Sequence, residues 1–271
     1  MFLFKLLKMY SSLNILFDLN YYFKYNYFCD RGVYMKVLLV IPSYNEEENI
    51  LKIYKKINDY NKNKNTKVDM IFIDDGSYDK TKEICVNNGI PHISLVHNLG
   101  IGGAVQTGYK YAYDNDYDVA IQFDGDGQHD INYIEDILKP IKNDDIDMVI
   151  GSRFIDKTSS SFKSSTARRI GIKIISFFIK LVTRKKIYDT TSGFRAINKK
   201  LIKEFATNYP VEYPEPVSTV NILKKKYKVK EVAVSMNERE SGKSSIHSWK
   251  NIYYMINVVL SILVAGMGGK K

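Results

Sequence analysis

Two aspartates, Asp124 and Asp126, follow an apolar run at residues 119–123. The run predicts a buried strand that delivers both carboxylates to its carboxyl end. Their oxygens, with the side-chain oxygen of Gln128, suit a hard divalent cation such as Mg²⁺ or Mn²⁺. The glycines between these residues let a bulky anionic ligand approach the backbone. The segment therefore predicts a metal site that bridges a diphosphate and neutralises its charge as it leaves.

Three other interpretations of this segment are possible. Acidic turns often follow strands, so an isolated Asp-x-Asp pair is weak evidence for a metal. The spacing also fits an EF-hand calcium loop, but His129 stands where that loop needs glycine, and a strand rather than a helix precedes it. The third interpretation, a solvated hairpin, needs a second strand close behind the first, but residues 131–141 have helical spacing instead.

Polar residues also follow the first two predicted strands, at residues 42–46 and 74–79. An aromatic ring and carboxylates at neighbouring strand ends can hold a nucleobase by stacking and hydrogen bonding. The nucleotide contacts predicted here are Pro42, Tyr44, Asn45, Glu46 and Asp75. The alternative is that Asn45 and Asp79 only cap the helices that follow.

A glycine-rich segment at residues 98–108 has the look of a dinucleotide-binding fingerprint. It follows the third predicted strand rather than the first, and no acidic residue in a separate ribose-binding position follows it. We therefore reject a nicotinamide-dependent enzyme. A glycine-rich turn at the start of a helix can still approach a ribose or phosphate, so Asn98 and Gly103 are further candidate nucleotide contacts.

The pattern of the remaining residues positions these clusters. From Met35 onward, apolar runs of strand length alternate with segments of helical spacing. The alternation predicts a parallel, doubly wound α/β sheet whose ligands bind beyond the carboxyl ends of its strands. The expected strands are residues 37–41, 68–73, 93–96, 119–123, 148–150 and 228–234. The expected helices are residues 46–62, 80–88, 102–114, 131–141 and 167–183, and residues 209–216, with three prolines, are expected to be non-helical.

The composition of the chain limits its class. With 271 residues, 45% of them hydrophobic, the chain is long enough for one sizeable domain with a real core. Two cysteines cannot form a disulfide framework, which indicates a reducing cytosolic setting. The net charge of +10 favours anionic partners: nucleic acid, phosphorylated substrates or an anionic membrane surface.

The two ends of the chain differ from its middle. Residues 1–34 are rich in Tyr, Phe and Asn and precede a clean strand at Met35. We interpret them as a non-native leader, translated from upstream DNA, or as a flexible arm. Residues 35–245 are expected to form the α/β domain. Residues 246–271 contain a strongly apolar run at 252–265 that is short for a membrane span, so we expect an interfacial segment or a truncated membrane segment.

Taken together, these motifs resemble the inverting glycosyltransferases of family 2, which have the GT-A (nucleotide-diphospho-sugar transferase) fold. The order and spacing match across residues 37–195. The motifs concerned are residues 42–46, 74–77, 98–108 and 124–126. The resemblance implies a nucleotide-sugar donor, a Mg²⁺ or Mn²⁺ cofactor, and a mostly parallel doubly wound sheet with a C-terminal helical extension.

A closer resemblance is to the dolichyl- or polyprenyl-phosphate sugar transferases, on residues 123–128, 151–154 and 189–196. It implies that Arg153 grips a lipid phosphate, helped less certainly by Arg168 and Arg169, because an arginine fork binds phosphate at two points. Ser192 and Arg195 of the third motif join this acceptor group. The resemblance also implies that a late basic loop closes over the donor diphosphate, with Arg239 and Lys243 as its candidate contacts.

We therefore expect a metal-dependent inverting glycosyltransferase with Asp124, Asp126, Asp189 and Arg153 at its catalytic centre. A polyprenyl-phosphate acceptor is already anionic and needs no protein base. A hydroxyl on a cell-surface glycan would need one, and Asp189, Glu212 and Glu215 are the candidates. Asp189 could instead only order the turn that follows it.

Two other classes of protein remain as alternatives. One is a sugar nucleotidyltransferase, although the chain lacks a Gly-rich basic loop after its first strand. The other is a non-enzymatic binder of nucleic acid or another anionic ligand, although this leaves the acids at successive strand ends unexplained. We expect no nucleic-acid partner and a cytoplasmic location, peripheral at the inner face of the cell membrane or bound to a membrane partner protein.

Overall fold

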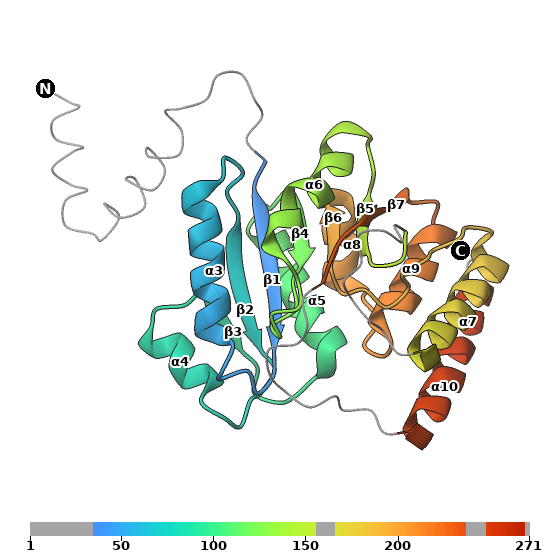
Figure 1. Cartoon of the computed structure of the whole chain (residues 1–271), viewed down its shortest axis with the longest axis horizontal. Coiled ribbons are helices and arrows are strands. Elements are labelled where there is room, and N and C mark those ends of the chain that lie inside the picture. Colours follow the sequence, from blue (N-terminus) through green and yellow to red (C-terminus); the bar gives the residue numbers. More distant parts are fainter. Residues whose placement is uncertain (1–34, 156–165, 237–247, 269–271) are drawn as a thin grey trace, which may run out of the picture. The chain divides into compact units, whose positions relative to one another are not determined.

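The computed structural model describes residues 35–155, 166–236 and 248–268 (Figure 1). The protein divides into two units, Met1–Met35 and Lys36–Lys271, and the fold below is that of the second unit. Among its described residues, seven strands form one sheet in the order β3-β2-β1-β4-β6-β5-β7. The strands are β1 (Val37–Ser43), β2 (Asp69–Asp74), β3 (His92–Ser94), β4 (Val119–Gln122), β5 (Met148–Ser152), β6 (Arg195–Asn198) and β7 (Val229–Ala233).

Most neighbouring strands run parallel. β1 pairs in parallel with β2 and β4, β2 with β3, and β5 with β7, whereas β6 is antiparallel to both β4 and β5. Every residue of β1 is buried, as expected for an apolar strand whose two faces are both covered. Because β1, β2 and β4 are parallel, the loops that follow them meet at one edge of the sheet. The predicted mostly parallel α/β sheet is confirmed.

Helices cover this sheet, and the later helices of the chain pack together as a helical extension of the domain. One hydrophobic core joins β1 and β2 to α5, α8 and α9 through side chains that include Val40, Ile73, Val105, Leu201 and Val220. α7 and α10 pack side by side and against α9 (Figure 1). The helices are α3 (Ile50–Asn63), α4 (Thr81–Asn87), α5 (Gly100–Asp114), α6 (Ile134–Asn143) with a preceding 3-10 turn (Ile131–Tyr133), α7 (Thr166–Thr183), α8 (Lys199–Thr207), α9 (Pro214–Lys224) and α10 (Ser248–Met267).

Several elements differ from the prediction. The short strand β6 and the helix α8 that follows it are present in the structure but were not predicted. β6 escapes prediction because it begins with Arg195, a charged residue that the sequence does not mark as buried. α9 begins at Pro214, so the expectation of a non-helical stretch is wrong for its last residues; proline fits the first turn, where no helical N–H partner is needed. α3 begins at Ile50 rather than at residue 46; residues 47–49 form a turn, in which the N–H groups of Asn49 and Ile50 donate to the Glu46 carbonyl.

Candidate active site

The loop after β4 carries Asp124 and Asp126. The Asp124 side chain is 32% exposed, whereas Asp126 is buried. Gly125 lies against the end of β1, since a Cβ there would come within 2.9 Å of the Pro42 carbonyl oxygen and 3.2 Å of the Ser43 hydroxyl. The motif thus packs against the end of β1, and one of its carboxylates is partly exposed to solvent.

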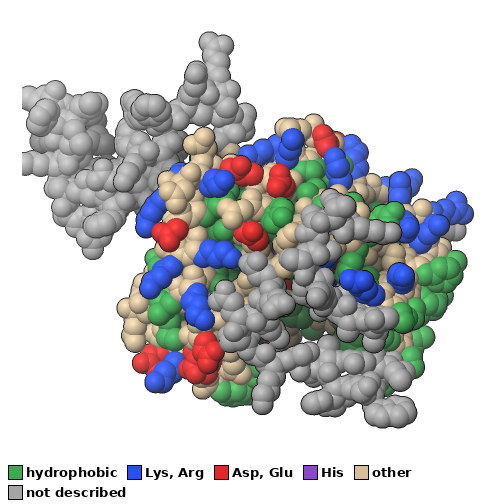
Figure 2. Space-filling view, viewed as in Figure 1, with side chains coloured by type: hydrophobic (Ala, Val, Ile, Leu, Met, Phe, Trp, Pro, Cys, Tyr) green, Lys and Arg blue, Asp and Glu red, His purple; other side chains and the backbone are tan. Residues whose placement is uncertain are grey.

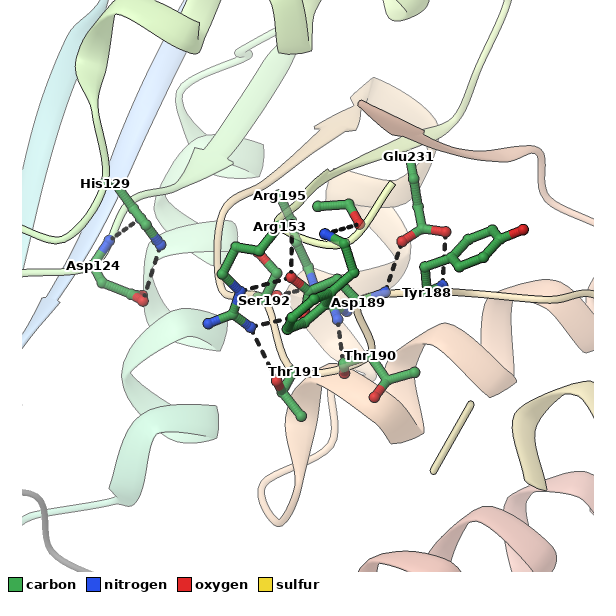
Figure 3. Close-up of polar contacts among 12 residues, drawn as sticks. Asp124, His129, Arg153, Tyr188, Asp189, Thr190, Thr191, Ser192, Arg195 and Glu231 are labelled. Carbon is green, nitrogen blue, oxygen red and sulfur yellow. Dashed lines mark hydrogen bonds and ion pairs between the residues drawn. The ribbon is translucent and has the colours of Figure 1, made fainter. Parts of the chain in front are cut away.

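A residue that the sequence analysis did not select, His129, contacts the first aspartate with both ring nitrogens (Figure 3). The backbone N–H of Asp124 donates to Nδ1 at 2.9 Å, so the ring proton resides on Nε2, which lies 3.3 Å from Oδ2 of Asp124. Burial is the largest effect on this imidazole and lowers its pKa to about 3, against the opposing attraction of Asp126. The ring is therefore neutral at physiological pH.

These residues fit a hard cation that takes part of its coordination from a substrate. The donors are two carboxylates and the Gln128 amide, all oxygen ligands. Among the described residues, no group of three or more His, Cys, Asp or Glu side chains is placed to hold a metal alone. That matches Mg²⁺-type sites, in which one or two carboxylates act together with substrate phosphates. The donor set therefore suits a cation bound with a diphosphate.

The loops after β1 and β2 hold each other through their polar groups. Asn45 adopts a φ of 54°, its N–H donates to the Ser77 hydroxyl, and its side-chain oxygen accepts from the Tyr78 N–H. Asn45 therefore does not cap α3. Asp79 is not the N-cap of α4, which is Lys80, but it accepts from the Thr81 N–H at the start of this helix and so satisfies one group of the first turn.

Two exposed rings and a buried carboxylate lie in these loops. Tyr44 and Tyr78 are 42% and 87% exposed, with their ring centroids 6.3 Å apart and edge to face. Asp75 is buried and accepts from the Leu99 N–H at 2.7 Å, and burial raises the pKa of this carboxyl. Asp75 therefore fixes the glycine-rich segment beside the second loop. The rings are free to stack on a base, and Pro42, Tyr44, Asn45, Glu46 and Asp75 remain predicted nucleotide contacts.

The glycines of α5 serve close packing. A Cβ at Gly108 would lie 2.0 Å from Val40 of β1, and one at Gly102 would lie 2.3 Å from the Val211 carbonyl oxygen. Gly103 is covered by the Leu99 side chain, 2.5 Å from its Cβ position. The fingerprint-like pattern is thus explained by helix packing. Asn98, which is exposed and caps Gly100 at 3.0 Å, and Gly103 remain only predicted nucleotide contacts.

Arg153 and Asp189 form a buried two-point ion pair (Figure 3). Nε and Nη2 of Arg153 donate to the two Asp189 oxygens at 2.7 and 2.8 Å, and Nη2 also donates to the Thr191 hydroxyl at 3.1 Å. Glu231 of β7 accepts from the backbone N–H groups of Tyr188 and Asp189, each at 2.8 Å. The pair anchors the 189–195 loop, and the alternative that Asp189 orders this turn gains support. Glu231 is a residue of this site that the sequence analysis missed.

The same loop brings Gly193 onto the metal motif. A Cβ at Gly193 would lie 2.7 and 2.8 Å from the two Asp124 carboxylate oxygens and 3.0 Å from Nε2 of Gln122. Ser192 is buried, and its hydroxyl has no hydrogen-bond partner among the described residues. Two predicted groups, the metal motif and the 189–195 loop, therefore meet at Asp124.

Arg195 is almost fully buried, and its contacts are those of a structural residue. Its guanidinium donates to the Ser192 and Glu215 carbonyls at 2.7 and 2.8 Å and to the Thr219 hydroxyl at 3.0 Å. These bonds tie the 189–195 loop to the start of α9, so a direct acceptor contact from Arg195 stays a prediction with little support. Arg169 is exposed on α7. The other predicted basic contacts, the Arg168 side chain, Arg239 and Lys243, lie outside the part of the chain that the structure describes.

Comparison with solved structures supports the same fold. The glucosyl-3-phosphoglycerate synthase of Mycobacterium tuberculosis superposes with a TM-score of 0.64 at 16% identity, covering 86% of this chain and 81% of that one. A structure of that enzyme with Mn²⁺, uridine diphosphate and phosphoglyceric acid gives a TM-score of 0.62 at 16% identity, over 88% and 80% of the two chains. The fold is GT-A, as the sequence predicts.

Sequence relatives point in the same direction. The chain is 32% identical over 211 residues to a UDP-N-acetylglucosamine–dolichyl-phosphate N-acetylglucosaminyltransferase of Methanococcus voltae, covering 71% of this chain and 81% of the relative. It is 30% identical over 219 residues to a dolichol-phosphate mannosyltransferase of Pyrococcus furiosus, covering 78% and 59%. The family model for glycosyl transferase family 2 matches residues 38–205. The chain therefore belongs to glycosyltransferase family 2 and is a sugar-transferring enzyme, rather than a nucleotidyltransferase or a non-enzymatic binding protein.

Proposed function

We propose that this enzyme transfers a sugar from a nucleoside-diphosphate donor to polyprenyl phosphate, with inversion at the anomeric carbon and with Mg²⁺ or Mn²⁺ as cofactor. The observation that carries the proposal is the convergence at the metal motif, where the end of β1 lies against Gly125 and the 189–195 loop lies against Asp124. Relatives named for dolichyl-phosphate acceptors, and a structural neighbour solved with Mn²⁺ and uridine diphosphate, support it.

The residues of the donor half have separable tasks in this scheme. Asp124 and Asp126 would hold the cation, and a cation held there would offset the charge of the departing diphosphate. The rings of Tyr44 and Tyr78 would stack on the base, and their exposure to solvent supports this role. The site thus separates the base contacts from the charges on the diphosphate.

On the acceptor side, Arg153 is the candidate for the lipid phosphate. Its Nε and Nη2 atoms are bound to Asp189, which fixes the plane of the guanidinium, so a phosphate would approach Nη1, which these bonds do not use, and little side-chain entropy would be lost on binding. An ionised phosphate oxygen needs no protein base, and it would attack the anomeric carbon from the face opposite the diphosphate. Inversion follows from this geometry.

The outer surface of α7 and α10 is suited to a membrane. Hydrophobic side chains gather at this end of the molecule (Figure 2). Among the residues that the structure describes, the exposed large hydrophobic ones are Ile170, Ile174, Phe177 and Leu181 of α7, and Tyr253, Tyr254, Ile256, Leu260, Val264 and Met267 of α10. None of the described helices is long and apolar enough to cross a bilayer. We propose that this face lies on the inner surface of the cell membrane, as amphipathic interfacial helices do.

A groove of about 690 Å³ runs between α9 and α10, beside this apolar surface. Its lining mixes aromatic, aliphatic and amide side chains, among them Tyr213, Tyr253, Asn257 and Leu260. Aromatic and aliphatic walls of this kind accept hydrocarbon, so the groove is our candidate for the first isoprene units of the acceptor.

A specific observation favours a second acceptor class, a hydroxyl of a cell-surface glycan. Of the three candidate bases, Asp189 is bound to Arg153 and Glu212 is exposed. The Glu215 carboxylate accepts from the side-chain amide of Gln122 at 3.4 Å, and Gln122 precedes Asp124 by two residues. Burial raises the pKa of the Glu215 carboxyl. Tyr213, just before it, has a φ of 49°, and strain of this kind is often stored near functional sites.

A donor screen tests both acceptor classes. Nucleotide release from a panel of nucleotide sugars would be measured with Mn²⁺ or Mg²⁺, and with polyprenyl phosphate or an alkyl glycoside as acceptor. We expect transfer to polyprenyl phosphate that Glu215→Gln leaves unchanged. If only the glycoside is glycosylated and Glu215→Gln abolishes this transfer while Glu212→Gln does not, the hydroxyl acceptor replaces the lipid phosphate.

A further inference from the structure

His129 contacts both Asp124 of the metal motif and Phe194 of the 189–195 loop, although none of the predicted roles includes it. Its side chain is 1% exposed, yet both ring nitrogens face Asp124: Nδ1 accepts from the backbone N–H and Nε2 lies 3.3 Å from Oδ2. A buried imidazole packed only as a hydrophobic ring would not direct both of its nitrogens toward one carboxylate residue.

The ring is held in place by its surroundings. It stacks on Phe194 at 4.8 Å and 22°, and it meets Phe123 edge to face at 5.5 Å. The backbone of His129 is fixed as well, because its carbonyl accepts from Lys56 at 3.3 Å and the residue forms an antiparallel bridge with Met236. The imidazole therefore has one orientation, and Asp124 is the residue that this orientation serves.

We propose that His129 is a positioning residue for the cation site: it retains one oxygen of Asp124, so that the other oxygen is presented to the divalent cation. The inference rests on the proposed metal-dependent function and deepens it. Groups that hydrogen-bond to a metal ligand fix its orientation, and their removal typically weakens metal affinity by about 10- to 100-fold. Because Phe194 follows Gly193 in the 189–195 loop, the same ring also connects that loop to the cation site.

The test measures Mn²⁺ binding directly, without turnover. Free Mn²⁺ would be followed by its electron paramagnetic resonance signal during titration of the full chain, first with Mn²⁺ alone and then with uridine diphosphate added. In His129→Phe the ring still stacks on Phe194 but lacks nitrogen, so we expect the Kd for Mn²⁺ to rise by about 10- to 100-fold. His129→Asn, whose amide is too short to reach the carboxylate, is expected to show a similar loss.

A matched control and a fold check complete the design. His92→Phe makes the same change in β3, where the half-buried ring contacts the Ile90 carbonyl at 2.8 Å, and it should bind Mn²⁺ like the wild type. Circular dichroism and thermal unfolding identify the variants that fold. In a folded variant, saturating Mn²⁺ should restore much of kcat, because only the occupancy of the site has changed.

Each outcome decides between the claims. A folded His129→Phe or His129→Asn chain that binds Mn²⁺ with the wild-type Kd would overturn the role of His129 and leave the proposed function standing. A wild-type protein that binds no Mn²⁺, with or without uridine diphosphate, would overturn the metal-dependent function and this inference with it. An equal loss of affinity in His92→Phe would show a general effect on folding rather than positioning, and would also overturn the inference.

Discussion

Replacing Gly193 by alanine probes the contact between the 189–195 loop and the metal motif with a single methyl group. Gly193 lacks a positive φ, so the backbone accepts alanine. The new Cβ would lie 2.7 and 2.8 Å from the two oxygens of Asp124, closer than such atoms approach in proteins. Restoring an ordinary contact requires the carboxylate or the loop to retreat by roughly 0.6 Å, which exceeds the tolerance of about 0.5 Å for a functional constellation.

The size of the effect follows from that displacement. A misplacement of about 1 Å can cost roughly 100-fold in rate, so a shift of just over half that size corresponds to about tenfold in kcat/KM, or about 1.4 kcal/mol of transition-state stabilisation. We therefore expect Gly193→Ala to lower metal-dependent nucleotide release about tenfold and to weaken Mn²⁺ binding. The free energy of unfolding should change by less than about 1 kcal/mol, because the substitution also restricts the unfolded chain.

Gly171→Ala is the matched control for this substitution. Gly171 lies in α7, and a Cβ there would first meet the sulfur of Met255 at 3.3 Å, which belongs to a flexible side chain. Nucleotide release and urea-induced unfolding would be measured for both variants and the wild type. Wild-type kcat/KM and Mn²⁺ affinity in Gly193→Ala would refute the reasoning, since the close approach of Gly193 to Asp124 leaves no room for the methyl group unless Asp124 or the 189–195 loop moves, and either movement alters the cation site.

Three further predictions concern neighbouring residues. Asp126→Ala should abolish metal-dependent nucleotide release, and unchanged turnover would argue against the cation site. Arg153→Ala should lower the free energy of unfolding by about 3–5 kcal/mol, because it leaves the Asp189 carboxylate buried without its charge partner. In the molecules that fold, the rate of transfer to lipid phosphate should fall more than the rate of donor hydrolysis. Equal losses in the two rates would contradict the acceptor role. Acidification from pH 7 to pH 5 should destabilise the wild type by about 2 kcal/mol more than His129→Phe. The folded ring, with a pKa of about 3, stays neutral in this window, whereas the unfolded imidazole gains a proton below its ordinary value of 6.5. The free energies of unfolding would be measured by urea denaturation at both pH values. An equal change between pH 7 and pH 5 in the wild type and in His129→Phe would contradict a buried, neutral His129 ring.

The parts of the fold that could be predicted are those encoded in local pattern. β1 has a continuous apolar sequence, and the Asp-Gly-Asp motif directly follows the apolar β4. The sequence does not predict β6 because Arg195 looks like a surface residue, and its burial depends on carbonyl and hydroxyl partners 20 and 24 residues away. A four-residue strand that opens with a charge carries no periodic signal.

The candidate site shows the same division between local and long-range information. Asp124 and Asp126 are visible in the sequence because one motif contains both. The Arg153–Asp189 pair joins residues 36 positions apart, and Glu231 supports that loop from yet another strand. His129 stands close to the motif in sequence, but its role depends on the direction of the ring, which is set by Phe123 and Phe194 in the folded protein.

The central claim is that a divalent cation joins Asp124 and Asp126 to the diphosphate of a nucleotide sugar. Crystals grown with Mn²⁺ and the donor identified by the screen would test it through the anomalous signal of manganese. We expect one manganese peak in contact with the Asp124 carboxylate and with both donor phosphates, beyond the end of β4. A nucleotide bound away from this loop, or bound there without manganese, would contradict the account.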